Sequence, residues 1–274
     1  MNETTDLDRR AVIKSALGAG FCAAVSPAWA QVVSTPADGL VAGEVKIGDL
    51  PAYRARPQGE GKFPTVLVIH EIFGVHEHIK DVCRRWAKLG YYALAPDLFA
   101  RQGDASAEKD MQKLMSGIVA HTPDAQVLAD LDATMAFAEG DGADVARAAV
   151  TGFCWGGREV WLYAAHNPKL KAGVAWYGPL ARPVTPNTPQ NPPDIVPELK
   201  VPVLGLYGGQ DKSIPADQIA AMQAKLAAAD DGSKIIVYPD AGHAFYADYR
   251  PSYVKADAEA SWKEATVWLK SHGV

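Results

Sequence analysis

A cysteine between two glycines, in the stretch Gly152-Phe153-Cys154-Trp155-Gly156, is the pattern with the clearest chemical meaning in this sequence. The spacing is that of a nucleophile elbow, G-x-S-x-G, with sulfur in place of the commoner hydroxyl. The glycines suit a sharp turn from a strand into a helix, where larger flanking side chains would clash. The partial positive charge at the start of that helix favours a thiolate. The pattern therefore predicts that Cys154 is a nucleophile.

A thiol nucleophile needs a base, and the base needs a group that orients it. In hydrolases with an elbow, the chain order is nucleophile, acid, histidine. Downstream of Cys154, Asp211 in LYGGQDKSIP and His243 in YPDAGHAF each follow a predicted strand. Asp217 and Asp240 are alternative acids, although Asp217 falls in the next predicted helix and Asp240 in a turn. We predict that Asp211 orients His243, which exchanges a proton with Cys154.

The stretch from His70 to His78, HEIFGVHEH, invites a metal interpretation because it is rich in histidine and glutamate. It lacks the H-E-x-x-H spacing of zinc sites, since Gly74 stands in place of the second histidine, and we predict no metal or cofactor. Glu71 ends a predicted buried strand, and the loop after such a strand normally supplies one N–H of an oxyanion hole. We expect the N–H groups of Ile72 and Trp155 to form that hole.

Hydrophobic patterning predicts the elements that bring these residues together. Short apolar runs alternate with helical patterns, which is typical of a mostly parallel sheet with helices on both faces. The predicted strands are 43–48, 52–57, 63–71, 91–97, 147–153, 172–178, 201–207 and 234–238, and the predicted helices are 77–89, 107–120, 123–138, 155–167, 216–228 and 256–271. Segment 178–198 contains seven prolines. We interpret it as an excursion from the strand ends where ligands bind in such folds.

Composition narrows the classes of protein further. The chain has 274 residues, of which 48% are hydrophobic and 22% charged, enough for one large domain, which we place at residues 31–274. The formal net charge is −5, and the pI is near 5.8. Because no basic excess is available to neutralise phosphates, nucleic acid is not an expected partner.

Residues 1–30 have the features of a cleaved export signal. The pair Arg9–Arg10 precedes an apolar stretch, Ser15 to Ser26, and Ala28 to Ala30 resembles a signal-peptidase site. The apolar stretch is about 12 residues long, whereas a membrane-spanning helix needs roughly 20, so no stable membrane anchor is expected. The twin arginines resemble a Tat signal, with an ordinary Sec signal as the alternative. We expect transient contact with the Tat machinery, cleavage before Gln31 and a periplasmic location.

Two cysteines remain after such cleavage, Cys83 and Cys154, and a disulfide between them is one interpretation. However, Cys83 shares one face of a predicted helix with Ile79, Val82 and Trp86, which indicates a small core residue. We therefore expect both thiols to be free.

Five motifs, HEIFG, APDLFARQGD, GFCWGG, GGQD and GHAF, occur in this order, and together they resemble the dienelactone hydrolase family (carboxymethylenebutenolidase type) from about Phe63 to the C-terminus. The resemblance implies an α/β-hydrolase fold with a catalytic cysteine, acid and histidine at Cys154, Asp211 and His243. It also implies that Glu71 holds the thiol in the resting enzyme and takes part in its activation when substrate arrives.

The resemblance also implies a substrate, because the family binds anionic enol-lactones. It places Arg101, in DLFARQ, at the substrate carboxylate. Members with this substrate carry a second arginine four residues after the histidine, where this chain has Ala247, and Arg250 lies three residues further on. Phe73 and Tyr177 are further expected substrate contacts. We expect hydrolysis of a small anionic lactone; the alternatives are a broad carboxylesterase, a non-catalytic binding protein and a thiol-redox protein, the last disfavoured because no C-x-x-C is present.

Overall fold

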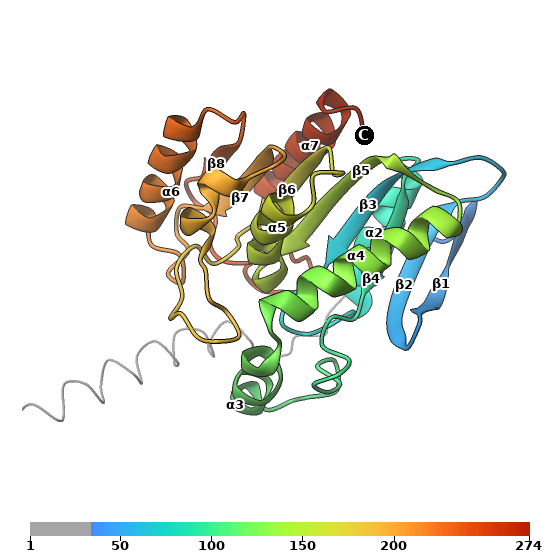
Figure 1. Cartoon of the computed structure of the whole chain (residues 1–274), viewed down its shortest axis with the longest axis horizontal. Coiled ribbons are helices and arrows are strands. Elements are labelled where there is room, and N and C mark those ends of the chain that lie inside the picture. Colours follow the sequence, from blue (N-terminus) through green and yellow to red (C-terminus); the bar gives the residue numbers. More distant parts are fainter. Residues whose placement is uncertain (1–33) are drawn as a thin grey trace, which may run out of the picture.

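The continuous apolar runs of the sequence form the middle of an eight-stranded sheet (Figure 1). The structure, a computed structural model, describes residues 34–274. Its strand order is β1-β2-β4-β3-β5-β6-β7-β8. The strands are β1 (Leu40–Ile47), β2 (Leu50–Pro57), β3 (Phe63–Ile69), β4 (Tyr92–Pro96), β5 (Ala143–Phe153), β6 (Ala172–Trp176), β7 (Val203–Gly208) and β8 (Lys234–Tyr238). The pairings β1–β2 and β2–β4 are antiparallel and the others parallel, which confirms the predicted fold class.

Helices cover both faces of this sheet (Figure 1). They are α2 (Glu77–Lys88), α3 (Met111–Lys113), α4 (Asp124–Gly140), α5 (Trp155–His166), α6 (Ala216–Ala229) and α7 (Lys255–Ser271). Helices α4 and α5 contact each other on one face, and α2 and α7 meet on the other through the rings of Trp86 and Trp262, whose centroids lie 4.3 Å apart. Within residues 34–274, no helix is long and apolar enough to cross a membrane.

The helix predicted at residues 107–120 is wrong in its extent. Only α3 is α-helical there, and it continues as a π turn (Leu114–Ile118) and a 3₁₀ turn (Val119–His121). The preceding residues form side-chain turns instead, in which the Asp104 carboxylate accepts hydrogen bonds from the N–H groups of Ser106 and Ala107. Asp110 then caps α3 in the same way. Such bonds compete with helix formation, which explains the late helix start.

The parallel strands end at one edge of the sheet, and each leads into a segment that carries a predicted site residue. Glu71 follows β3, Cys154 follows β5 and Tyr177 follows β6, while Asp211 and His243 lie in the turns after β7 and β8. Parallel strands that share a direction bring their carboxyl ends together. The fold therefore gathers residues that are far apart in sequence at this edge.

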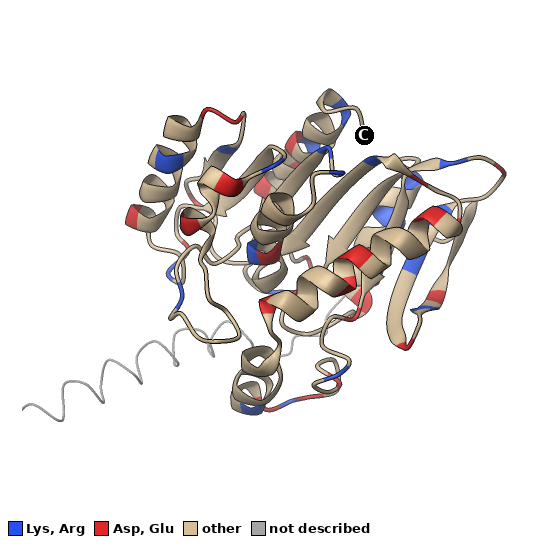
Figure 2. Cartoon of the chain, viewed as in Figure 1, with Lys and Arg blue, Asp and Glu red and all other residues tan. Residues whose placement is uncertain are grey.

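Charged side chains are nearly absent from the middle strands and lie mostly on helices and loops (Figure 2). Four of these helix and loop residues near the sheet's C-terminal edge are exceptions because they are buried: Glu71, Asp211, Arg158 and Glu159 are each at most 5% exposed. Buried charges are rare unless they are paired or functional. The burial of these four residues therefore indicates a functional site at this edge of the sheet.

Candidate active site

The turn at Cys154 has the geometry that its two glycines predict. Cys154 has φ 53° and ψ −117°, a left-handed conformation that is unusual for a residue with a side chain. A Cβ on Gly152 would lie 2.3 Å from the Gly156 carbonyl oxygen, and one on Gly156 would lie 2.5 Å from the His70 carbonyl oxygen. Only glycine fits at either position. Helix α5 starts at the next residue, Trp155, so the cysteine sits at a helix N-terminus.

The structure brings Cys154, His243 and Asp211 into one hydrogen-bonded series. The Cys154 Sγ lies 3.2 Å from the His243 Nε2, and the His243 Nδ1 lies 2.7 Å from the Asp211 Oδ2. The alternative acids are not in this position, since Asp217 lies in the first turn of α6 and Asp240 in the turn after β8. Of the three carboxylates weighed from the sequence, Asp211 is the one bonded to the histidine.

Ser213 also belongs to this series, although it is not among the site residues predicted from the sequence. Its N–H and hydroxyl both donate to the Asp211 Oδ1, at 2.8 and 2.6 Å, and its Oγ lies 3.2 Å from the His243 Nδ1. The sequence does hold a local signal for Ser213, because an aspartate side chain commonly bonds to the residue two positions later in a turn. Ser213 fixes the carboxylate that faces the histidine.

The charges of the three groups support one another. Burial lowers the pKa of His243, but the Cys154 sulfur and the Asp211 carboxylate outweigh it and raise that pKa to about 10. Burial raises the pKa of Asp211, and its bonds to His243 and Ser213 bring the net pKa below its ordinary value. Near neutral pH the histidine is therefore an imidazolium between two groups that can carry negative charge. A cation in this position stabilises a thiolate.

The loop after β3 is held by His70. Burial lowers the pKa of His70 to about 4, so the ring is neutral near pH 7. Its Nδ1 donates to the Glu71 carbonyl oxygen, at 2.6 Å, and its Nε2 accepts from the Leu98 N–H, at 3.1 Å. The ring also stacks on Trp155, with centroids 5.4 Å apart. His70 thus ties the loop that carries Ile72 to the first residue of α5.

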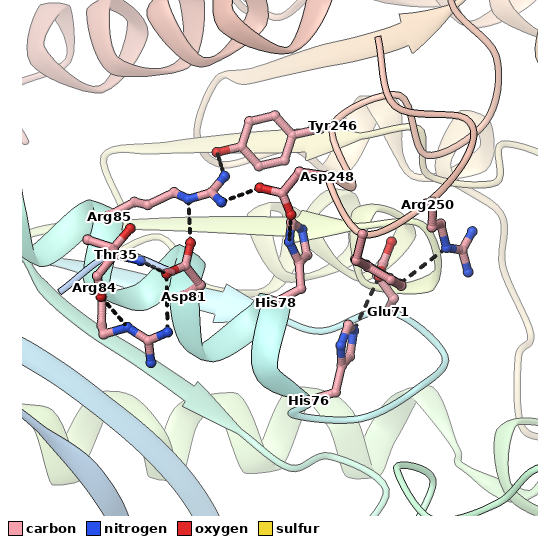
Figure 3. A network of polar contacts seen from close by, with 11 residues as sticks. Thr35, Glu71, His76, His78, Asp81, Arg84, Arg85, Tyr246, Asp248 and Arg250 are labelled. Carbon is pink, nitrogen blue, oxygen red and sulfur yellow. Dashed lines mark hydrogen bonds and ion pairs between the residues drawn. The ribbon is translucent and has the colours of Figure 1, made fainter. Parts of the chain in front are cut away.

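Glu71 is buried beside this turn, but the structure gives it other partners than the expected thiol. The Tyr249 hydroxyl donates to the Glu71 Oε2 at 2.6 Å, and the His76 Nε2 lies 3.4 Å from the same oxygen (Figure 3). Burial works against ionisation, but His76 and the charge of Arg250 hold the pKa of Glu71 well below its usual range. Within residues 34–274 the Glu71 Oε1 has no hydrogen-bond partner, and the polar partner of Cys154 is His243.

A second set of polar contacts fixes the loop that carries Tyr249 and Arg250 (Figure 3). The His78 Nδ1 lies 3.1 Å from the Asp248 Oδ1, and Arg85 pairs with the other oxygen of Asp248. Arg85 in turn donates from Nε to the buried Asp81 carboxylate at 2.6 Å. The second and third histidines of HEIFGVHEH are thus engaged by carboxylates. Among the described residues, no group of three or more potential ligands is arranged to hold a metal ion.

Arg101 is placed differently from the role that the resemblance implies. Its guanidinium makes two bonds to the Asp130 carboxylate, at 2.5 and 2.8 Å, and its side chain is 53% exposed. A bidentate pair of this kind already uses the fork that would receive a substrate carboxylate. The sequence could not reveal this, because Asp130 lies on α4, far along the chain.

The remaining expected contacts lie close to the thiol. The guanidinium of Arg250 lies 5.1 Å from the Phe73 ring centroid and interacts electrostatically with Glu71 and Cys154. Arg250 thus reaches the site, three residues beyond the position of Ala247. The ring of Tyr177 meets His243 edge-on, with centroids 5.3 Å apart. The Tyr177 backbone has φ 38°, and among the described residues its buried hydroxyl has no hydrogen-bond partner.

The two cysteines are free thiols, as predicted. Cys83 is buried in α2 with Ile79, Val82 and Trp86, and burial raises its pKa far above the ordinary value. It packs as a core residue.

These features define an α/β hydrolase: a mostly parallel sheet, a strained turn after its central strand, and an acid and a histidine in the turns after later strands. Comparison with known proteins then identifies the family: the model of the dienelactone hydrolase family matches residues 50–273, and the chain belongs to it.

Similar proteins agree with this assignment. A candidate carboxymethylenebutenolidase from Methylorubrum extorquens is 56% identical, with 98% of this chain and 95% of that protein covered. The crystal structure of a candidate dienelactone hydrolase from Klebsiella pneumoniae has a TM-score of 0.82 and 50% identity, and covers 84% of this chain and 98% of that one. A candidate 2-oxo-3-(5-oxofuran-2-ylidene)propanoate lactonase from Bradyrhizobium is 32% identical over 81% of this chain and 89% of that protein. The chain is therefore a hydrolase of lactone or ester bonds.

Proposed function

We propose that this protein opens a small anionic lactone through a Cys-His-Asp triad. The observation that carries the proposal is the series of contacts from the Cys154 Sγ through both nitrogens of His243 to Asp211. A strained nucleophile, a base within hydrogen-bond distance and a carboxylate that orients the base are the parts that acyl transfer requires.

The reaction follows from these positions. The Cys154 thiolate attacks the lactone carbonyl carbon, and the N–H groups of Ile72 and Trp155 stabilise the oxyanion. As the ring C–O bond breaks, the imidazolium of His243 gives its proton to the departing ring oxygen, which leaves a thioester. His243, held by Asp211, then takes a proton from water, and the resulting hydroxide attacks the thioester carbonyl. Collapse breaks the C–S bond and restores the thiolate beside the imidazolium, and the new carboxylic acid loses its proton to solvent.

The anionic character of the substrate is supported by relatives and by charge. The names carboxymethylenebutenolidase and 2-oxo-3-(5-oxofuran-2-ylidene)propanoate lactonase both denote lactones that carry a carboxylate. Near Cys154, Arg250 stacks on Phe73 and adds positive charge, although Glu71 is its own counterion, and the hydroxyl of Tyr177 has no partner within the described residues. Such donors suit a small anionic ligand.

Hydrolysis of 4-carboxymethylenebut-2-en-4-olide, followed by the loss of its ultraviolet absorbance, tests the proposal. We expect turnover by the unmodified protein and none above background by Cys154→Ala, with both proteins equally folded by circular dichroism. Turnover retained by Cys154→Ala would exclude the triad.

A broad carboxylesterase is the competing function, and a non-catalytic binding protein is another. Neutral aryl esters tested beside the lactone distinguish a carboxylesterase from a lactonase. An esterase would hydrolyse the aryl esters faster than the lactone and would still need Cys154. Tight lactone binding by the unmodified protein, with no turnover of any substrate, would favour the second.

We also propose that residues 1–30 direct export to the periplasm by the twin-arginine route. This segment lies outside the described residues, and the support is the order of Arg9–Arg10, the apolar stretch and Ala28 to Ala30. Cell fractionation of a bacterium expressing the full chain, beside a variant with both arginines changed to lysine, tests it. We expect the variant to stay in the cytoplasm. Unchanged export of the variant would point to the Sec route.

A further inference from the structure

We propose that Arg182, on the proline-rich segment after β6, binds the carboxylate of the substrate and so determines the preference for anionic lactones. The inference rests on the proposed function and adds to it a residue that replaces Arg101 in this role.

The start of the segment lies against the turn that carries the nucleophile. Tyr177 contacts the ring of His243, and the next residue, Gly178, is so close to α5 that a Cβ there would lie 2.4 Å from the Gly157 carbonyl carbon. Leu180 is fully buried. The chain therefore leaves β6 beside the histidine and passes the first turn of α5 just before it reaches Arg182.

The far side of the segment is tied to the same helix. The Arg158 Nη2 donates to the Gln190 carbonyl oxygen at 2.7 Å, and Arg158 also makes two bonds to Asp124, at 2.7 and 2.8 Å. The next residue, Asn191, accepts from the Arg182 N–H at 2.9 Å and donates to the Arg182 carbonyl oxygen at 3.1 Å. Both backbone groups of Arg182 are thus held, and a fixed backbone positions a binding side chain with little loss of entropy.

The guanidinium of Arg182 has no directly bonded carboxylate among the described residues. The residue is half-buried, and no hydrogen bond or ion pair to another side chain holds its guanidinium within residues 34–274. Burial and the repulsion of Arg158 lower the pKa of Arg182, against the attraction of the Cys154 sulfur and of the Glu159 and Asp124 carboxylates. Asp124 and Glu159 are both already bonded to Arg158, so the guanidinium donors of Arg182 stay open to a further anion. A substrate carboxylate would supply that anion next to the nucleophile.

The other arginines near the site are already balanced. Arg101 is paired with Asp130, and Arg250 faces Glu71, which is its strongest electrostatic partner. The fork of Arg182 remains open to a planar carboxylate, which an arginine can bind through two parallel bonds.

The test uses two ligands that differ in one charge: 4-carboxymethylenebut-2-en-4-olide and its primary carboxamide. Binding to full-length Cys154→Ala is measured by calorimetry, alone and combined with Arg182→Gln, Arg182→Lys or Arg101→Gln. We expect Arg182→Gln to raise the Kd of the carboxylate by about tenfold or more and that of the carboxamide less than about twofold. Arg182→Lys should fall between, because it keeps the charge but not the fork.

Arg101→Gln is the matched control and should leave both Kd values nearly unchanged. Equal weakening of both ligands by Arg182→Gln, a larger effect of Arg101→Gln, or no binding of the carboxylate would overturn the inference. These binding results test the role of Arg182 and not the proposed function. The proposed function is tested by whether Cys154→Ala abolishes turnover.

Discussion

Cys83 and Cys154 are both buried free thiols, yet the structure gives them opposite surroundings. Cys83 lies inside α2, where its neighbours are core side chains, and Cys154 lies in a left-handed turn with its sulfur 3.2 Å from an imidazole. Their exposed fractions, 0% and 5%, hardly differ. Burial therefore does not distinguish the two thiols. The backbone conformation and the charge that faces the sulfur do, and both favour reactivity at Cys154.

Alkylation should separate the two thiols most widely. We expect iodoacetamide at pH 7 to modify Cys154 in the folded protein, while Cys83 reacts only when the protein unfolds. Because unfolded molecules are rarer than about one in 10³, the two rates should differ by at least that factor. Mass spectrometry of peptides over time measures both rates. Comparable labelling of the two residues would contradict the contrast.

Exchange of sulfur for oxygen should affect the two positions differently. We expect Cys154→Ser to lower kcat by roughly 10²–10⁴-fold, since a hydroxyl is a weaker nucleophile than a thiol and gives its proton to His243 less readily. Cys83→Ser should leave kcat unchanged and lower the free energy of unfolding by about 1–3 kcal/mol, because a hydroxyl enters an apolar core. Lactone kinetics and urea unfolding of both variants provide the comparison.

The titration of His243 should respond to one cysteine only. The folded-state pKa of His243, about 10, lies above its ordinary value near 6.5. The stabilisation that protonated His243 contributes is therefore complete below pH 6.5 and is lost as the pH rises through 10. Loss of the sulfur in Cys154→Ala should move the pKa of His243 down, and Cys83→Ala should not. NMR titration of the imidazole signals measures this pKa. An unchanged value in Cys154→Ala would show that Asp211 alone sets it.

The smallest expected effect concerns Ser213. Its removal in Ser213→Ala leaves Asp211 with fewer donors, so we expect kcat to fall by about two- to tenfold, the size of one ordinary hydrogen bond. The pKa of Asp211 should rise, and the activity should decline at a higher pH on the acid side of the profile. A pH–rate profile of this variant beside the unmodified protein is the measurement. Identical profiles would remove Ser213 from the site.

Much of the fold was predictable because its signals are local. Each central strand contains an apolar run. Gly152 and Gly156 indicate the turn at Cys154, because a Cβ at these positions would lie 2.3 and 2.5 Å from backbone carbonyl oxygens. Asp211 and His243 were found because both follow strands in the expected chain order. The predicted extent of the helix at residues 107–120 was wrong for a local reason as well. The turns at Asp104 and Asp110 compete with the helix that the composition favours.

The sequence by itself predicted the type of sheet, the candidate nucleophile, and the order of the candidate acid and histidine, because these depend on neighbours along the chain. The tertiary structure alone decided which charges meet. Arg101 is paired with Asp130, Glu71 accepts a bond from Tyr249, and the backbone of Arg182 is bonded to the Asn191 side chain. Ion pairs depend on distances of a few ångströms between segments far apart in sequence, and no local pattern encodes those distances.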